Sequence, residues 1–311
     1  MSLEQFSSLQ LQSPSGRLLK DAYRVPVEQL VSDHYGLNWR VKAFSDMDEY
    51  ASHPSAILSD GNISVFVKLS EAANGLGQFE VELEGLRLLS RLAGVLIPAP
   101  IGIAAAEGGA VLVLEALQAQ ERTPRHWRDI GRALAQIHLV KGARFGLEKQ
   151  GYFGPLFQDN RPMHNWLEFF AERRLWPRLM GAIDAGILPT DVIRQVEKLI
   201  ARLPAIEIPE TAPALLHGDA QQNNFISTEG GAAIIDPAVY YGHPEMDLAH
   251  VDFFQAVPDD VFAGYREILP IEPGFAERRE LWRIPAYLAV VTVSGEAVYL
   301  EKLVSALRAY L

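Results

Sequence analysis

Residues 215–249 read LLHGDAQQNNFISTEGGAAIIDPAVYYGHPEMDLA and place short apolar runs beside acidic and amide side chains. The runs NFIST and AAIID flank a turn at residues 228–231, a pattern that predicts two strands joined by that turn. Asp219, Asn224 and Asp236 fall at the ends of these runs, where polar groups are costly unless they bind something. Carboxylate and amide oxygens suit Mg²⁺, which takes its remaining ligands from water and phosphate. The stretch therefore predicts a magnesium–phosphate site.

Composition and charge set the broad class of the protein. The chain has 311 residues, 49% of them hydrophobic and 22% charged, which is ordinary for a globular protein with room for two lobes. A net charge of −11 argues against a nucleic-acid partner, which would require clustered Lys and Arg. Because the chain has no cysteine, disulfides, thiolate catalysis and Cys-ligated zinc are excluded. Lacking a signal peptide and a long apolar run, the sequence predicts a cytoplasmic protein with no membrane partner, as a monomer or homodimer.

The first 117 residues predict a small lobe built mostly of strands. A polar arm covers residues 1–25, and the amphipathic spacing over residues 79–93 predicts a helix that ends before Pro98 and Pro100. Asp-Gly-Asn at residues 60–62 is a hairpin signal. The other expected elements are a helix at 27–34 and strands at 37–45, 55–61, 63–70 and 110–117.

The remaining residues, 118–311, predict a mainly helical second lobe. A Gly/Pro-rich loop occupies residues 151–162, and the aromatic helix expected at 165–180 is interrupted near Pro177. The other helices are expected at 127–138, at 190–203 and, as a set of three, from Asp260 onward. The fold class that follows is α+β, with a small N-terminal sheet lobe and a larger helical C-terminal lobe.

Lys68 lies on the apolar run ISVFVKLS, where its charge is costly to bury. A lone strand lysine is more often a surface residue whose ammonium group reaches water. The helix at 79–93 alters that balance, because Glu82 falls near its buried edge and is placed to pair with Lys68. Glu80 and Glu84 fit a solvated face of the same helix. A Lys–Glu pair between strand and helix is the arrangement that holds a lysine against nucleotide phosphates.

Together these features resemble a known family. Lys68, Glu82 and the pattern HGD-x4-N followed by Ile-Asp resemble the two-lobed protein-kinase-like fold of aminoglycoside phosphotransferases. More narrowly, IDPAVYYGHPEMDLA at 235–249 is similar to the signature of the fructosamine (ketosamine) kinase family. GYFGPLFQDN at 151–160 and NWLEFFAERRL at 165–175 are similar to a second stretch of that family. The resemblance covers about two hundred and forty residues and implies ATP and Mg²⁺ as cofactors.

The resemblance implies a role for each residue of the phosphoryl-transfer set. Asp219 is expected to orient and deprotonate the acceptor hydroxyl, and Asn224 and Asp236 are expected to hold Mg²⁺. Residues 1–117 become the nucleotide-binding lobe and residues 118–311 the catalytic and substrate-binding lobe. The expected nucleotide contacts are Lys68, Glu82 and the backbone of Glu115, Ala116 and Leu117 at the adenine edge.

Other residues near the motif are expected to support the loop or to face the acceptor. His217 is expected to hold the loop through hydrogen bonds, and Asp247 resembles the buried Asp that ties the loop to a helix. Tyr240, Tyr241 and His243 are candidates for the acceptor side, although aromatic residues after a strand more often serve packing.

Two stretches depart from the family pattern. The loop SDMDEYASHPSA at 45–56 contains no glycine where a glycine-rich phosphate loop is expected, so Ser52 and His53 are the candidate phosphate contacts there. Many fructosamine kinases read HGDLWSGN, whereas this chain reads HGDAQQNN at 217–224. A Trp beside the base would shape the acceptor pocket, so its replacement bears on the identity of the acceptor.

Three alternatives to a fructosamine kinase follow from the same residues. In the first alternative, the acceptor is an aminoglycoside or another polyhydroxy metabolite, since an acidic protein suits any cationic acceptor. In the second alternative, the chain is a non-catalytic nucleotide- or sugar-binding relative, which the unusual loop at 45–56 favours. A metal-dependent hydrolase is the weakest alternative, because no second His accompanies His217 at ligand spacing.

Overall fold

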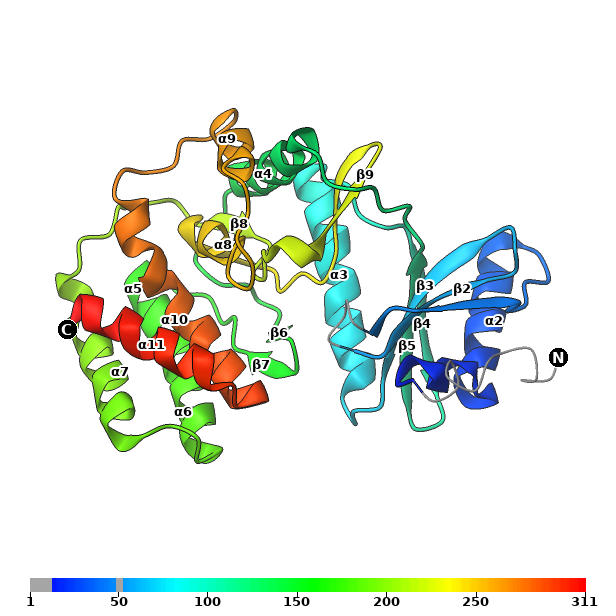
Figure 1. The fold of residues 1–311 in the computed structure, drawn as a ribbon, viewed down its shortest axis with the longest axis horizontal. Coiled ribbons are helices and arrows are strands. Elements are labelled where there is room, and N and C mark those ends of the chain that lie inside the picture. The colour runs from blue at the N-terminus through cyan, green and yellow to red at the C-terminus, as the bar shows by residue number, and fades with distance from the viewer. Residues whose placement is uncertain (1–12, 49–52) are drawn as a thin grey trace. The chain divides into compact units, whose positions relative to one another are not determined.

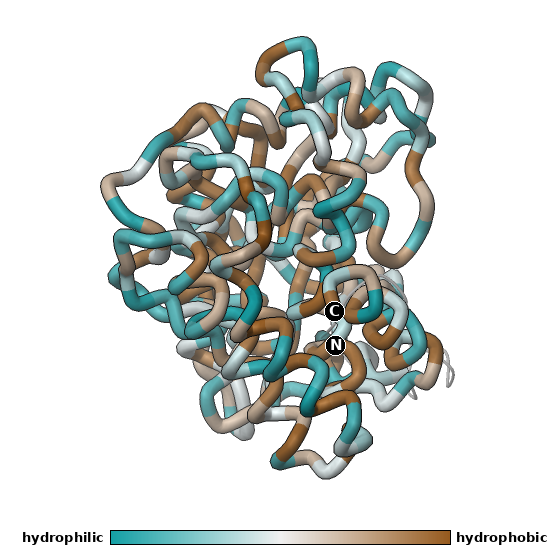
Figure 2. Tube along the Cα trace, turned by 90° about the vertical axis from the view of Figure 1, so that its left-hand side faces the viewer, coloured by the Kyte–Doolittle hydropathy of each residue, from teal (hydrophilic) through white to brown (hydrophobic). Residues whose placement is uncertain are grey.

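The computed structural model describes residues 13–48 and 53–311. The chain divides into two compact units, the first made of Met1–Arg87, Leu96–Glu121 and Ile226–Ile235, and the second of the remaining segments. The fold class is α+β, as the sequence predicts, with an antiparallel sheet near the N-terminus and a mainly helical remainder (Figure 1). Polar and apolar residues interleave along the chain (Figure 2), and no helix in the described ranges is long and apolar enough to cross a membrane.

A five-stranded antiparallel sheet with strand order β1-β2-β3-β5-β4 forms the centre of the first unit. The expected strands at 55–61, 63–70 and 110–117 are present, because each alternates or runs apolar between turn residues. The strands are β1 (Ala43–Asp46), β2 (Ser55–Ser59), β3 (Ser64–Ser70), β4 (Pro100–Ala106) and β5 (Gly109–Glu115).

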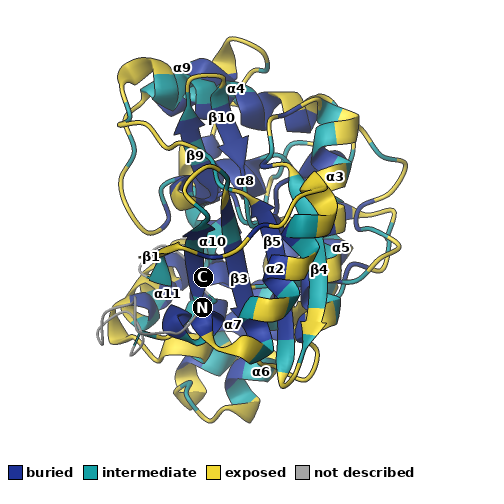
Figure 3. Cartoon of the chain, turned by 90° about the vertical axis from the view of Figure 1, so that its right-hand side faces the viewer, coloured by how far each residue is buried: buried dark blue, intermediate teal, exposed yellow. Residues whose placement is uncertain are grey.

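Helices cover both faces of this sheet: α2 (Asp21–Tyr35) packs on one face and α3 (Gly75–Ala93) on the other (Figure 1). Side chains of a strand alternate between faces, so Val111 and Val113 of β5 pack with α2, while Leu112 and Leu114 pack with α3. Figure 3 shows β3 and β5 as mostly buried strands. A strand that is covered on both faces tolerates a polar side chain only where that side chain has a hydrogen-bond or ion-pair partner.

Two sequence predictions for the first unit are wrong in detail. The strand expected at 37–45 begins only at Ala43, because Trp39 and Val41 bury their side chains in the core with α2 instead of joining the ladder. No strand was predicted between Pro98 and residue 110, yet β4 begins at Pro100. This proline is tolerated because β4 is an edge strand with a register shift between Pro100 and Gly102.

The N-terminal segment also differs from the expected polar arm. Within its described part, a short 3-10 helix at Ser15–Leu19 precedes α2, and Leu18 and Leu19 are buried in the core. Helix α2 begins at Asp21, so it takes up the end of the arm and the whole of the helix expected at 27–34. The buried leucines anchor this segment, since each removes apolar area from water.

The second unit is mainly helical, as predicted for the residues after 117. Helices α10 and α11 lie side by side, with α6 beside α10 (Figure 1). Its helices are α4 (Pro124–Leu139), α5 (Trp166–Phe169), α6 (Trp176–Asp184), α7 (Thr190–Arg202), α8 (Glu245–His250), α9 (Asp260–Arg266), α10 (Phe275–Ser294) and α11 (Ala297–Tyr310), and its strands are β6 (Gly151–Phe153), β7 (Leu156–Gln158), β8 (Ala214–Leu216) and β11 (Tyr240–Gly242).

Pro177 does not interrupt the aromatic helix in the way that was expected. It is the second residue of α6, which continues without a break from the preceding helical turns. The irregularity lies just before it, as a π-helical turn at Phe170–Leu175 between α5 and α6. Such turns are rare and frequently occur at functional sites.

The stretch at 215–249 forms two separate strand pairs. The predicted hairpin joins β9 (Phe225–Thr228) to β10 (Gly231–Ile234). Strand β8, just before His217, pairs with β11, so that Leu216 lies opposite Tyr240. The HGD motif therefore follows one strand pair and Asp236 follows the other.

Candidate active site

The motif His217-Gly218-Asp219 forms a tight loop directly after β8. Gly218 has a positive φ of 83°, which glycine adopts without strain. A Cβ atom on Gly218 would lie 2.0 Å from the carbonyl oxygen of Ala238. Glycine is therefore required at this position both for its positive φ and for the close contact with Ala238. The contact between the two backbone segments fixes the position of the next residue, Asp219.

Asp247, on α8, holds this loop through hydrogen bonds to its backbone. Its carboxylate accepts the backbone N–H of His217 at 2.7 Å and that of Gly218 at 2.9 Å. It also accepts Nε2–H of His138 at 3.1 Å, which leaves His138 Nδ1 to accept the hydroxyl of Tyr265 at 2.9 Å. Burial alone would raise the pKa of Asp247, but the hydrogen bonds from His138 and from the backbone amides hold that pKa below its usual value.

The ring of His217 is fully buried and stabilises the loop from inside. Its Nδ1 accepts the backbone N–H of Asp219 at 3.2 Å, and its ring centroid lies 5.5 Å from that of Phe225. The side chain therefore helps to fix the conformation of the loop. The supporting role of His217 stays a prediction.

Asn224 ends a short 3-10 helix and reaches back to the loop. Its Nδ2 donates to the backbone carbonyl of Asp219 at 2.8 Å and to the Asp219 carboxylate at 3.1 Å. Both bonds use the amide nitrogen, so the amide oxygen remains available as a metal ligand. Asp236 follows β10 and has a φ of 53°, unusual for a residue other than glycine. Such conformations cluster at ligand and active sites.

The two carboxylates of the site influence each other. Burial, and then the negative charge of Asp236, raise the pKa of Asp219 to about 7. A site that accumulates negative charge favours a cation, and its carboxylate and amide oxygens are the hard ligands that Mg²⁺ takes. No group of three or more His, Cys, Asp or Glu at metal spacing occurs within 13–48 and 53–311. The donor set thus fits an ion that keeps water and phosphate as ligands.

In the first unit, the Lys68–Glu82 ion pair expected from the sequence is present, with 2.7 Å between Lys68 Nζ and Glu82 Oε1. Its origin is the alternation of β3: Val65, Val67 and Leu69 face α2, so Lys68 faces α3. Lys68 is only 2% exposed. A charge that deeply buried needs a partner, and Glu82 supplies it.

Other expected nucleotide contacts lie in the same unit. The chain leaves β5 at Glu115, and the N–H of Leu117 makes no hydrogen bond to the described part of the chain. That N–H is free to bind a base edge. His53 lies against Phe79, with ring centroids 5.5 Å apart, and Ser52 lies outside the described residues.

The three acceptor-side candidates divide between a pocket and the core. Tyr240 is buried and lines a pocket beside Gly218. Tyr241 exchanges backbone hydrogen bonds with Gly146 at 2.7 and 3.1 Å, which is a structural contact. His243 is 2% exposed and stacks on Trp282, and burial lowers its pKa to about 4. His243 therefore serves packing, the alternative that the sequence favoured for these residues.

Two residues that hold the site were missed in the sequence. His138, at the end of α4, reaches Asp247, and its position on the apolar face of that helix was the available signal. Arg122 donates to the backbone carbonyls of Gln222 and Phe225, each at 2.7 Å, and fixes the segment that carries Asn224. No local pattern marks Arg122, because its partners are about a hundred residues away in the sequence.

Comparison with known proteins places these residues in a family. Residues 25–311 match the fructosamine kinase family. A probable ketoamine kinase of Synechocystis sp. is 32% identical over 264 residues, covering 83% of this chain and 87% of that protein. The ketosamine-3-kinase of Mus musculus is 30% identical over 251 residues, covering 72% of this chain and 81% of that protein.

Solved structures show the same relationship. The crystal structure of a Thermobifida fusca protein, provisionally assigned as a fructosamine-3-kinase, has a TM-score of 0.80 and 32% identity and covers 91% of this chain and 98% of that one. An aminoglycoside phosphotransferase in ternary complex with ADP and hygromycin B has a TM-score of 0.57 and 16% identity, covering 91% and 96%. The second likeness shows the shared kinase-like fold alone.

Proposed function

The chain belongs to the fructosamine kinase family of ATP-dependent phosphotransferases, and from that premise we propose that it transfers the γ-phosphate of ATP to a sugar hydroxyl of a ketosamine. The observation that carries the proposal is the position of Asp219 on a loop that Asp247, His138 and Asn224 hold rigid. A catalytic base is effective only when it is held within hydrogen-bond reach of the proton that it removes.

Asp219 would accept the proton of the acceptor hydroxyl as the oxygen attacks the γ-phosphate. Its pKa of about 7 lies near the operating pH, where general-base catalysis is efficient. The hydrogen bond from Asn224 Nδ2 to the Asp219 carboxylate restricts the rotation of that carboxylate. The acceptor hydroxyl is thereby oriented before any bond changes.

Asn224 and Asp236 would hold Mg²⁺ through the amide oxygen and the carboxylate. When bound, Mg²⁺ supplies positive charge that stabilises the negative charge on the transferring phosphoryl group. The left-handed backbone of Asp236, with its φ of 53°, sets the direction of its Cα–Cβ bond.

Lys68 would neutralise the phosphates of the nucleotide. Glu82 keeps the ammonium group extended from β3, because the 2.7 Å ion pair compensates its burial. The backbone at Glu115 and Leu117 would bind the adenine edge. The loop at 45–56 provides His53 as a further phosphate contact in this proposal.

The residues that follow Asp219, from Ala220 to Gln222, are the candidate acceptor-side segment of the loop. Ala220 is fully buried, and Gln222 is held by Arg122 and Gln255 through hydrogen bonds of 3.0 and 2.9 Å. Gln221 is therefore the side chain beside Asp219 that remains partly exposed to meet an acceptor. An amide there suits hydroxyl groups, which both donate and accept hydrogen bonds.

The test measures ADP release from Mg²⁺-ATP with a panel of ketosamines, aminoglycosides and free sugars, and locates the new phosphate by ³¹P NMR. The wild-type protein is expected to turn over ketosamines. Asp219→Asn is expected to lower kcat by about 10²- to 10⁴-fold, the usual contribution of general-base catalysis. Asp236→Ala is expected to abolish turnover at every Mg²⁺ concentration tested.

Asp184→Asn, at the exposed end of α6, is the matched control and should behave as wild type. Turnover of an aminoglycoside in preference to every ketosamine would overturn the acceptor class. Unchanged kcat in both site variants would show that the assigned roles are wrong.

A further inference from the structure

A pocket in the second unit lies against the HGD loop, and two arginine side chains contribute to its lining. It includes the backbone of Gly218, the residue before Asp219, and is partly open to solvent. Its polar lining contains Arg174 and Arg178 together with His250 and Gln158. The rest is apolar or aromatic, contributed by Phe153, Tyr240, Met246, Pro285 and Ala286.

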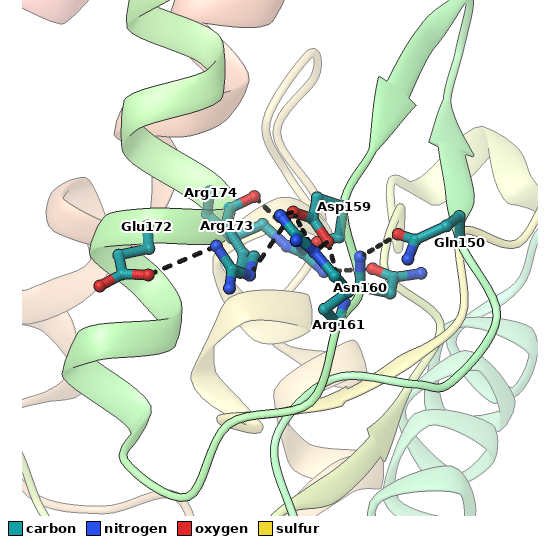
Figure 4. Close-up of polar contacts among 7 residues, drawn as sticks. All are labelled: Gln150, Asp159, Asn160, Arg161, Glu172, Arg173 and Arg174. Atoms are coloured by element: carbon teal, nitrogen blue, oxygen red, sulfur yellow. Dashed lines mark hydrogen bonds and ion pairs between the residues drawn. The ribbon is translucent and has the colours of Figure 1, made fainter.

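Arg174 is 4% exposed, and its hydrogen bonds to the described residues go to neutral acceptors. Its Nη1 donates to the backbone carbonyl of Asp159 at 2.8 Å, and its Nη2 donates to Asn160 Oδ1 at 2.8 Å (Figure 4). The Asp159 carboxylate is instead paired with Arg161 at 2.6 Å and Arg173 at 3.5 Å. The Arg174 guanidinium lies 3.9 Å from the centroid of the Tyr240 ring, and its Nε has no partner in the described structure.

Arg178 lies one helical turn further along and is 8% exposed. Its one hydrogen bond to the described residues goes to the carbonyl oxygen of Phe157 at a long 3.4 Å. Burial, and then the positive charge of Arg174, lower the pKa of Arg178 to about 10. Across 13–48 and 53–311, neither Arg174 nor Arg178 forms an ion pair with a carboxylate.

His250 adds a second kind of unused donor to the pocket. It is 5% exposed, and neither Nδ1 nor Nε2 has a hydrogen-bond partner among the described residues. Buried polar atoms are normally satisfied, so exceptions call for an explanation such as a bound ligand. Two buried guanidinium groups that form no ion pair with a carboxylate of the described residues, together with an unsatisfied imidazole, favour an anion.

We propose that this pocket is a carboxylate-binding subsite for the acceptor, so that the enzyme prefers ketosamines formed from amino acids with a free carboxylate. The inference rests on the proposed function. Consecutive Cα atoms lie about 3.8 Å apart, so the pocket wall at Gly218 is one residue from the base Asp219. A planar carboxylate matches the fork of a guanidinium, and the apolar remainder of the lining excludes competing water.

The test compares fructosylglycine with fructosylglycinamide, which differ only in the charge of the terminal group. Wild-type kcat/KM is expected to be about 10- to 100-fold higher for the acid, as for a charge-assisted hydrogen bond in a desolvated site. Arg178→Gln is expected to reduce the value for the acid to that for the amide. It should lower the value for the amide far less than the value for the acid, because only the acid offers Arg178 a carboxylate.

Two further variants separate recognition from folding. Arg178→Lys should retain part of the preference, since it keeps the charge but loses the fork. Arg173→Gln is the matched control, because Arg173 adjoins Arg174 in the same helical turn but pairs with Asp159 and Glu172. It should keep the full preference for the acid. Equal wild-type kcat/KM for acid and amide, or a preference that survives Arg178→Gln, would overturn the inference.

A binding measurement distinguishes failure of this inference from failure of the proposed function. In chloride-free buffer, saturating acetate is expected to raise the wild-type Tm by about 2 °C and acetamide is not, with no effect of acetate on Arg178→Gln. If no ketosamine supports ADP release but acetate still acts in this way, the proposed acceptor class fails and the anion subsite stands. Equal effects of acetate and acetamide would remove the subsite, whatever the enzyme turns over.

Discussion

At the scale of single residues, Asp219 shows how burial and a neighbouring charge set the ionisation of the site. Its carboxylate accepts a hydrogen bond from Asn224 Nδ2 at 3.1 Å, and burial with the Asp236 charge raises its pKa to about 7. A carboxyl with a raised pKa in the folded protein stabilises the fold while it is protonated. That stability is complete below about pH 4 and is lost as the pH rises through about 7. The metal-free site is therefore strained at neutral pH.

From this follows a prediction on stability and pH. In EDTA, Asp219→Asn should raise Tm at pH 8, and the difference from wild type should shrink toward pH 5, because the amide carries no charge to repel Asp236. Thermal unfolding by circular dichroism at both pH values measures it. Asp184→Asn should show no such pH-dependent gain. A constant difference between Asp219→Asn and wild type at all pH values would mean that Asp219 does not titrate in this range.

At the scale of elements, helices α4 and α9 approach each other through glycine. A Cβ on Gly131 of α4 would lie 1.9 Å from the carbonyl oxygen of Val261. A Cβ on Gly264 of α9 would lie 2.1 Å from the carbonyl oxygen of Arg128. Glycine weakens a helix by about 1 kcal/mol relative to alanine, so its presence here reflects close packing. The contact positions His138, which lies two turns after Gly131 on α4 and donates to Asp247.

A single methyl group should therefore separate these helices. Gly131→Ala is expected to lower the free energy of unfolding by about 2–4 kcal/mol, since the clash is with backbone that cannot rotate away. Gly181→Ala, on α6 with no heavy atom near its added Cβ, should instead stabilise the protein by up to about 1 kcal/mol. Urea unfolding measures both changes. Equal stability of Gly131→Ala and wild type would show that the helices shift apart without cost.

At the scale of the whole molecule, the net charge of −11 opposes the local charge of the proposed anion subsite. Long-range attraction should favour a cationic ketosamine, whereas Arg174 and Arg178 act only at contact distance. The net charge of the protein therefore acts on the amine of the substrate, whereas the arginine pocket acts on its carboxylate.

Salt should separate these two effects. Raising the ionic strength from about 0.05 M to 0.5 M shortens the screening length severalfold. It should lower kcat/KM for fructosylglycinamide, which carries a net positive charge, more than for zwitterionic fructosylglycine. Steady-state ADP release at each salt concentration measures the slopes, and MgCl₂ is held constant as the control. Identical slopes for the two substrates would exclude steering by the net charge.

Several features of this protein followed from the sequence by itself. The α+β class, the strands β2, β3 and β5 and the helix α3 were predictable, because local apolar periodicity and turn residues determine them. The Lys68–Glu82 pair was also predictable, since strand alternation and helix periodicity each assign a face. Strand β4 was not, because an edge strand that begins at a proline lacks the usual local signals.

Tertiary structure alone decided the rest of the site. His138 and Arg122 reach their partners across about a hundred residues of sequence, and such distant contacts leave no local pattern. The charge of Arg174 and Arg178 could be read from the sequence, but their lack of a carboxylate partner could not. It depends on which side chains the fold brings to Asp159, and on burial that removes water from both guanidinium groups.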